Sequence, residues 1–265
     1  MTPADAAAHG FVDNLALPRL AESDKRHLTR VLRLPPGSAV TVGDGMGRWR
    51  ACRLMAGGEL EPAGEVVEDQ RPMPELTVAF ALVKGERPEL VVRALTEIGV
   101  DRIVPFTAER SVVRWDETKA HAKLLRLAEI ARQAAMQSRR SFIPRVGMAL
   151  PGEASPHRVP PFAEVATLDG AALASRDGGP PSPTQQCVLV GPEGGWGAEE
   201  QQAGLPRLRL AAHVLRTETA AIAAGELLVA LRAGLVAAAQ GRGTNARPPR
   251  GGGRFNCPPP RQSIE

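Results

Sequence analysis

Aromatic residues are scarce in this 265-residue chain: they make up 3% of it, and tyrosine is absent altogether. A core must therefore be built mainly from aliphatic side chains, which a hydrophobic fraction of 43% supplies in sufficient number. The shortage of aromatic rings also argues against a single-stranded nucleic-acid site made of stacked aromatic platforms. Glycine-rich turns and charged side chains are then the features left to carry a function.

Cysteine is almost as rare, and the three that occur, Cys52, Cys187 and Cys257, are scattered along the chain. They form no C-x-x-C pair and none of the spacings typical of a metal site. We therefore predict buried, reduced thiols for Cys52 and Cys187 and no bound metal.

The chain also lacks a clear membrane or export signal. Residues 1–10 contain no basic segment followed by an apolar run, so no signal peptide is expected and the predicted location is cytoplasmic. Residues 220–239 are rich in Ala and Leu, but Glu226 and Arg232 interrupt them. The pattern favours a buried or dimer-facing helix over a membrane span.

Charge is unevenly distributed. Of 33 basic and 29 acidic residues, residues 241–265 hold five arginines and one glutamate, so the remaining chain is neutral. This tail is rich in Gly and Pro, has little apolar content and is predicted to be disordered. An alternative is a nonspecific RNA tether that acts by releasing counterions. An RNA-binding face on the rest of the chain must come from local clusters of charge.

The first 71 residues have the pattern of short strands joined by turns. Residues 40–42 and 49–54 flank Gly43-Asp44-Gly45-Met46-Gly47, which literally contains G-x-G-x-G. A dinucleotide-type turn requires a helix after the glycines, whereas the residues that follow here alternate like a strand. We therefore predict a hairpin.

An alternation of strands and helices begins after residues 68–74, which contain two prolines and mark the predicted domain boundary. Such an alternation is typical of an α/β fold with a parallel sheet. A loop rich in Gly and Pro is expected at 175–184. The predicted strands are 76–83, 102–105, 165–168 and 187–190, and the predicted helices are 88–98 and 119–138.

Two further turns follow apolar segments, at 188–197 (VLVGPEGGWG) and at 210–220 (LAAHVLRTETA). Two turns so close in sequence can form one pocket at the carboxyl ends of strands, where open α/β sheets hold ligands. Neither turn contains a P-loop lysine or a G-x-G-x-x-G spacing. The predicted pocket therefore suits a cofactor held by backbone groups and apolar contacts rather than a nucleotide polyphosphate.

Together, GPEGG and VLRTETA resemble the RsmE-type methyltransferases of the SPOUT class. Other matches follow in the same order along the chain, so that the resemblance covers roughly residues 9–240. They are LTRVLR at 28–33, TEIGV at 96–100, PF at 105–106, ERSVV at 109–113 and QS at 137–138.

The resemblance implies a PUA-like, RNA-binding β-barrel at 1–72 and a SPOUT domain with a C-terminal trefoil knot at 73–240, followed by the tail at 241–265. It implies methylation of N3 of a uridine in small-subunit (16S) ribosomal RNA with S-adenosylmethionine. It also implies a homodimer. Uracil N3 must lose a proton before it attacks a methyl sulfonium, so the site needs a route for that proton and a group that favours the anion. No metal is required.

Roles for individual residues follow from the resemblance and this chemistry. Arg216 would favour the uridine anion, although a salt bridge to Glu218 stays open. Glu193 would act as a base or bind the ribose, or else cap nearby amides. Thr217 would either line the pocket or cap the helix that follows. The remaining expected cofactor contacts are Leu189, Val190, Gly191, Gly194, Gly195, Leu210 and Leu215. The expected RNA contacts are Arg30, Arg33, Arg110, Arg139 and Arg140.

The chain departs from the family pattern at three places. Ala211-Ala212 replaces a common Gly-Pro, Met136 replaces an acidic residue, and Ala94 replaces a lysine. These changes keep two alternatives open: a catalytically inactive RNA-binding homologue on the same scaffold, and a SPOUT methyltransferase that acts on another RNA.

Overall fold

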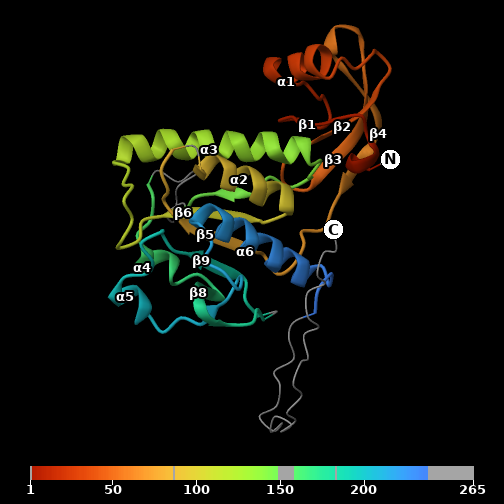
Figure 1. Ribbon diagram of the computed structural model, residues 1–265. Coiled ribbons are helices and arrows are strands. Elements are labelled where there is room, and N and C mark those ends of the chain that lie inside the picture. The colour runs from red at the N-terminus through yellow and green to blue at the C-terminus, as the bar shows by residue number, and fades with distance from the viewer. Residues whose placement is uncertain (1, 86, 149–157, 183, 238–265) are drawn as a thin grey trace, which may run out of the picture.

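The computed structural model describes residues 2–85, 87–148, 158–182 and 184–237 (Figure 1). These residues form two sheets, one of four strands and one of six. We call residues 2–68 the N-terminal unit and residues 76–237 the C-terminal unit. The tail predicted at 241–265 lies outside the described residues.

The N-terminal unit is a four-stranded sheet with the order β1-β2-β3-β4. The predicted hairpin is confirmed, because β2 and β3 pair antiparallel on either side of the glycine-rich turn. No described ladder joins β4 to β1, so hydrogen bonding does not close the predicted β-barrel. Helix α1 leads into one π-helical turn at His27–Val31. The elements are β1 (His9–Phe11), α1 (Glu22–Arg26), β2 (Ala39–Gly43), β3 (Arg48–Leu54) and β4 (Leu60–Glu68).

The C-terminal unit contains the predicted parallel sheet, with the order β10-β8-β9-β5-β6-β7 and parallel pairing throughout. Its central strands are continuous apolar runs because both faces of the sheet are covered. The strands are β5 (Thr77–Ala81), β6 (Arg102–Phe106), β7 (Arg145–Val146), β8 (Ala171–Gly179), β9 (Cys187–Val190) and β10 (Arg207–Leu208).

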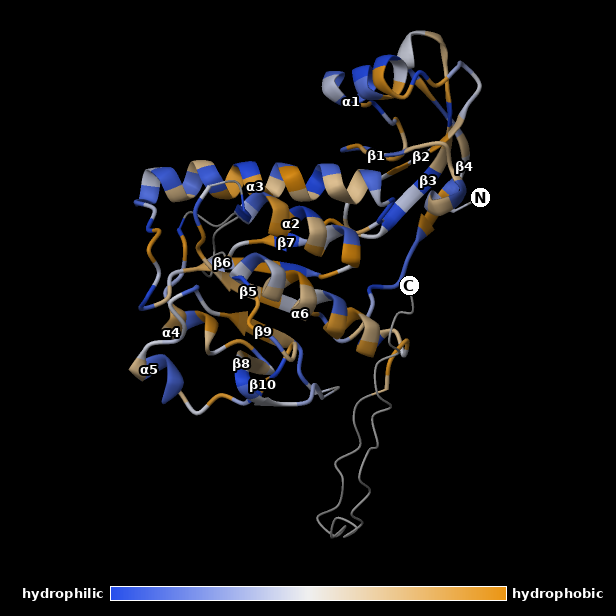
Figure 2. Ribbon diagram, viewed as in Figure 1, coloured by the Kyte–Doolittle hydropathy of each residue, from blue (hydrophilic) through white to orange (hydrophobic). Residues whose placement is uncertain are grey.

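Alternate residues of β5 build the two cores of this unit. Val78 and Phe80 pack against α2 (Arg87–Ile98), α3 (Glu117–Gln137) and α6 (Thr217–Arg232). Figure 1 shows these three helices beside the sheet, and Figure 2 shows the apolar strands behind them and the mixed polarity of α3.

Ala79 and Ala81 point to the opposite face of the sheet. The short helix α4 (Phe162–Val165) and Trp196 pack there, while α5 (Ala198–Gln201) follows the turn after β9. The predicted helices at 88–98 and 119–138 are thus confirmed as α2 and α3. Asp116 begins α3 by accepting a hydrogen bond from the Lys119 amide at 2.9 Å.

Two predictions about local structure are wrong. Residues 165–168 do not form a strand: Val165 ends helix α4, and the chain turns before β8 begins at Ala171. So short a run, with the polar residue Thr167 inside it, does not distinguish a helix from a strand by periodicity. The loop predicted at 175–184 is also wrong over its first half, because residues 175–179 continue β8.

The helix predicted at 220–239 begins earlier and ends sooner than expected. It runs from Thr217 to Arg232, and Gly234 adopts φ +67°, the left-handed conformation that commonly follows a helix C-terminus. Ala221, Ala224 and Leu228 are buried in the core of the same chain. Residues 238 and 239 lie outside the described residues.

The described part of the chain contains no helix that combines the length and apolar character needed to cross a membrane. It also contains no group of three or more His, Cys, Asp or Glu side chains placed to hold a metal ion. Cys52 and Cys187 are buried and free, as predicted. Burial raises the pKa of the Cys52 thiol to about 11 and that of Cys187 to about 12.

Candidate active site

A pocket of about 370 Å³ lies beside the central residues of β8 and at the carboxyl end of β9. Three chain segments supply most of its lining: residues 173–177 of β8, the turn after β9, and the residues between β10 and α6. The two predicted turns therefore meet in one pocket. They do not follow adjacent strands, because β8 lies between β9 and β10 and contributes its own residues.

The first turn depends on two glycines and a tryptophan. Gly195 has φ +73°, a conformation that side chains other than glycine rarely adopt. A Cβ on Gly191 would lie 3.0 Å from the Trp196 ring. That ring stacks on Phe106 and donates a hydrogen bond from Nε1 to the Ala174 carbonyl at 2.9 Å. The indole thus fixes the first turn to the middle of β8.

The second turn is tied to the first by Thr217. Its hydroxyl does not cap α6. Instead, Thr217 Oγ1 donates to the Gly191 carbonyl at 2.9 Å, and the residue is buried. Arg216 occupies the N-cap position of α6 with an exposed side chain. Its guanidinium has no hydrogen bond or ion pair with any described residue, and the salt bridge to Glu218 considered above is not formed.

Glu218 faces a different arginine, Arg87, which no sequence motif marked as a site residue. Arg87 Nε lies 3.6 Å from Glu218 Oε1, and Arg87 Nη1 donates to Glu193 Oε1 at 3.1 Å. Arg87 begins α2, so it connects that helix to both turns of the pocket. Glu218 Oε2 is buried and has no hydrogen-bond partner among the described residues.

Most of the predicted cofactor contacts line the pocket. Leu189 and Gly194 do not: Leu189 is fully buried in the core, and the Gly194 carbonyl accepts a hydrogen bond from Arg110 Nη1 at 3.2 Å. Ser175 and Asp177 of β8 were missed, because this stretch was predicted to be a loop. The predicted residues in the lining are Val190, Gly191, Glu193, Gly195, Leu210, Leu215 and Thr217.

The five arginines predicted to contact RNA do not form one cluster. Arg30 and Arg33 are exposed near the end of the helical segment that follows α1, and Arg110 is exposed beside the first turn of the pocket. Arg139 and Arg140 instead donate to backbone carbonyl groups of the protein. Burial lowers the pKa of Arg140 to about 10. Their hydrogen bonds give these two residues a structural role.

The lining of the pocket indicates the kind of ligand it can hold. Val190, Leu210 and Leu215 offer an apolar wall, while Asp177, Glu193, Arg176 and Arg207 contribute charged groups of both signs. Its volume lies within the usual range for small-molecule sites. Such a lining suits a ligand that combines an apolar ring with hydrogen-bonding groups.

Comparison with known proteins agrees with this geometry. The RNA methyltransferase domain family matches residues 69–229, and the PUA domain of RNA methyltransferases matches residues 20–59. The chain belongs to the RNA methyltransferase family. The six-stranded sheet is accordingly the RNA methyltransferase domain, and the four-stranded sheet is a PUA-like domain.

Relatives of this RNA methyltransferase cover most of its length. The ribosomal RNA small subunit methyltransferase E of Mycobacterium bovis is 33% identical over 217 residues, which are 75% of this chain and 80% of the relative. The Bacillus subtilis protein of the same name is 29% identical, covering 73% of this chain and 82% of the relative.

A solved structure resembles both domains of this RNA methyltransferase. It is a ribosomal RNA small subunit methyltransferase E from Neisseria gonorrhoeae bound to S-adenosyl methionine. It is 28% identical, covers 84% of this chain and 97% of its own, and superposes with a TM-score of 0.65.

Proposed function

We propose that the protein methylates N3 of a uridine in small-subunit ribosomal RNA, using S-adenosylmethionine held in the pocket between the two turns. The pocket carries this proposal: its two turns are tied together at the carboxyl end of a parallel sheet, in a chain whose relatives are small-subunit rRNA methyltransferases. A catalytically inactive RNA-binding homologue, or an enzyme with another RNA target, would be the alternatives.

The lining fits the cofactor in size and in chemistry. Val190, Leu210 and Leu215 would contact the adenine, and the glycine turn would bring backbone groups close to the ribose and amino-acid portions. When bound, S-adenosylmethionine supplies an electrophilic methyl group on a sulfonium. Asp177 and Glu193 add carboxylate oxygens to the lining, and each is paired with an arginine, Arg207 and Arg87 respectively.

Arg216 and Glu193 are the side chains that we propose for catalysis. Arg216 projects from the start of α6 without a partner among the described residues, so its charge is available to a uracil anion. Glu193 lies in the pocket with its carboxylate hydrogen-bonded by Arg87, which leaves its second oxygen to take up the N3 proton or to bind the cofactor. RNA would reach this site along Arg110 and along Arg30 and Arg33 of the PUA-like domain.

The proposal also includes the domain ranges, the knot, the oligomeric state and the cellular location. We infer domain ranges of 1–72 and 73–240 followed by the tail, and a trefoil knot, supported by family membership and by the meeting of the two turns. A homodimer is supported by exposed apolar side chains at Val214 and Leu235. A cytoplasmic location is supported by the buried free thiols, which suit a reducing compartment.

The direct test is transfer of a labelled methyl group. We expect the full chain, incubated with labelled S-adenosylmethionine and small ribosomal subunits that lack the modification, to place the label on N3 of one uridine. The modified nucleotide is located by nuclease mapping and mass spectrometry. Label on another atom or another RNA would support the second alternative. Cofactor binding without any transfer would support the inactive homologue.

Ala211 provides a second test, because it lines the pocket at a position where the family commonly has glycine. We expect Ala211→Gly to tighten cofactor binding, since removing a methyl group from the lining enlarges the space for the ligand. Isothermal titration calorimetry of both proteins measures the change. Ala212→Gly, at the exposed neighbouring position, is the matched control. Equal affinities of the Ala211 variant and the wild type would mean that this methyl does not crowd the cofactor.

A further inference from the structure

The glycine-rich turn of the N-terminal hairpin packs against the methyltransferase domain. Gly45 and Gly47 adopt φ +76° and +105°, and both lie against the methyltransferase domain. A Cβ on Gly45 would lie 2.7 Å from Ile143 Cδ1, and a Cβ on Gly47 would overlap the Phe142 ring. The Ile143 amide donates to the Gly45 carbonyl at 2.9 Å, and the Gly47 amide donates to the Ser141 carbonyl at 3.1 Å. The absence of side chains thus allows the two backbones to meet.

Two arginines near the end of α3 hold the other side of the same contact. Arg139, at φ +59°, donates to the carbonyls of Ala4, Ala6 and Ala7 in the N-terminal unit. Arg132 forms an ion pair with the buried Asp24 of α1. A buried charge is costly without its partner, so the Arg132–Asp24 pair constrains how the two domains can separate.

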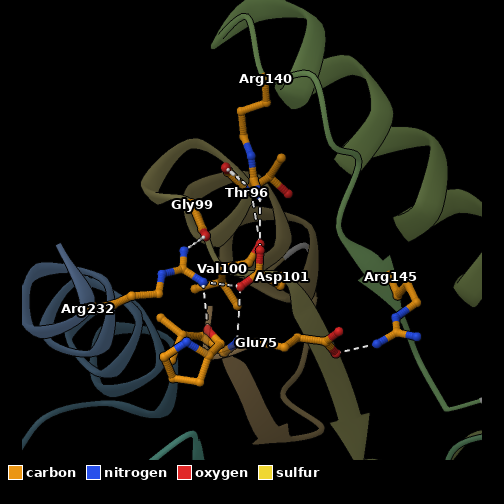
Figure 3. Close-up of polar contacts among 10 residues, drawn as sticks. Glu75, Thr96, Gly99, Val100, Asp101, Arg140, Arg145 and Arg232 are labelled. Atoms are coloured by element: carbon orange, nitrogen blue, oxygen red, sulfur yellow. Dashed lines mark hydrogen bonds and ion pairs between the residues drawn. The ribbon is translucent and has the colours of Figure 1, made fainter. Parts of the chain in front are cut away.

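The same stretch of chain is anchored to the helix that borders the pocket. Figure 3 shows Asp101 between Arg140, which follows α3, and Arg232, at the end of α6. Arg140 also donates to the Thr96 carbonyl at 2.6 Å, and Arg232 donates to the Gly99 carbonyl at 3.0 Å. Asp101 Oδ2 accepts from the Leu76 amide at 3.0 Å, at the entry to β5.

A continuous set of packed contacts therefore joins the PUA-like domain to α6, whose first residues line the pocket. We propose that the hairpin glycines, Arg139 and the Arg132–Asp24 pair form a rigid interdomain joint. This joint fixes the distance from Arg30 and Arg33 to the pocket and so determines which uridine reaches the methyl donor. This positioning role rests on the proposed function. Its residues touch neither RNA nor cofactor and act through the placement of one domain on the other.

Substitutions that open the joint test this role in the full-length protein. Gly47→Ala should push the hairpin off Phe142, and Asp24→Asn should remove the charged partner that Arg132 has in the N-terminal unit while its pair with Glu129 remains. The domain separation can be measured as the distance between spin labels on Glu61→Cys and Lys123→Cys in a Cys257→Ser background. The remaining thiols are buried with raised pKa values, so they should not react with the label.

With labelled chains diluted in unlabelled protein, so that only the intrachain distance is measured, we expect one narrow distance distribution in the parent protein and a broader or shifted one in both variants. Turnover on saturating ribosomal substrate should fall on the order of 10- to 100-fold, the scale expected when a reactant is misplaced by about an ångström. The transferred methyl group should also appear on nucleotides near the target uridine. Cofactor affinity should stay unchanged, a result that separates misplacement from damage to the pocket.

Two matched controls isolate the joint from general effects of substitution. Gly57→Ala also changes a positive-φ glycine of the N-terminal unit (φ +79°), but its new Cβ meets no atom within 4 Å. Glu59→Gln removes the charged partner of Lys25 within one domain. Both should retain the parent distance, turnover and target nucleotide.

The possible failures are distinguishable. Unchanged distances in both variants would show that these contacts do not hold the joint. Altered distances with normal turnover and the normal target would show that the joint does not position the RNA. An inactive parent protein would instead refute the proposed methyl transfer, and the distance measurement would still report whether the joint exists.

Discussion

Arg216→Ala should lower turnover on ribosomal substrate by roughly 100-fold or more, the usual scale for loss of one preorganised electrostatic stabiliser. The guanidinium has no partner among the described residues, so its removal should leave the fold and the cofactor affinity almost unchanged. The effect should fall on the chemical step, because a uracil anion exists only as the proton leaves N3. Single-turnover rates with prebound cofactor measure that step directly.

Arg216→Lys should recover little of the lost rate if the planar, two-point geometry of the guanidinium is used. Arg126→Ala, which removes an exposed arginine of α3, is the control for a change in surface charge. A rate close to that of the wild type in Arg216→Ala would show that Arg216 has no catalytic role. The catalytic assignment would then move to Glu193.

Gly195→Val should abolish detectable cofactor binding, with at least a tenfold loss of affinity, equivalent to about 1.4 kcal/mol. Two effects combine: valine is strained at φ +73°, and its side chain would enter the turn that lines the pocket. Calorimetric titration with S-adenosylmethionine measures the loss, and thermal unfolding shows whether the protein remains folded.

Gly204→Val is a closely matched control for this substitution. Gly204 has φ +71°, its added Cβ also meets no atom within 4 Å, and it lies outside the pocket lining. Backbone strain alone should therefore cost both variants similar stability, while only Gly195→Val should lose the cofactor. Equal affinities in the two variants would mean that the first turn does not hold the ligand.

The sequence predicted those elements of the fold whose signals are local. The apolar run around Val78 and Phe80, the period of α2 and the glycine turn of the hairpin each specify their structure within a few residues. The strand β8 was missed because Asp177, Gly178 and Gly179 look like a loop. A Cβ on Gly178 would collide with the backbone of Leu208, so this glycine permits close pairing with β10. That partner is 30 residues away, and no local pattern reveals it.

The candidate site, too, could be predicted only where its signals are local in sequence. The backbone turns could be found because glycine and threonine patterns identify them. The side-chain partners could not, because they come from distant elements: Arg87 reaches both Glu193 and Glu218 from α2. Arg139 and Arg140 show most clearly that side-chain partners cannot be predicted from sequence. These adjacent arginines contact different parts of the protein: Arg139 binds the N-terminal unit, and Arg140 binds carbonyls at the end of α2 and just after it. The roles of Glu193, Arg216 and the arginines expected to face RNA stay predictions.

The stacking of Trp196 on Phe106 has a spectroscopic consequence. The chain has no tyrosine and three tryptophans, so its near-ultraviolet emission comes from indole rings alone. Trp49 is buried in the PUA-like domain and Trp115 lies just before α3, whereas Trp196 borders the pocket. The protein thus contains an intrinsic fluorophore at the wall of its proposed cofactor site, and occupancy there can be followed optically without an attached dye.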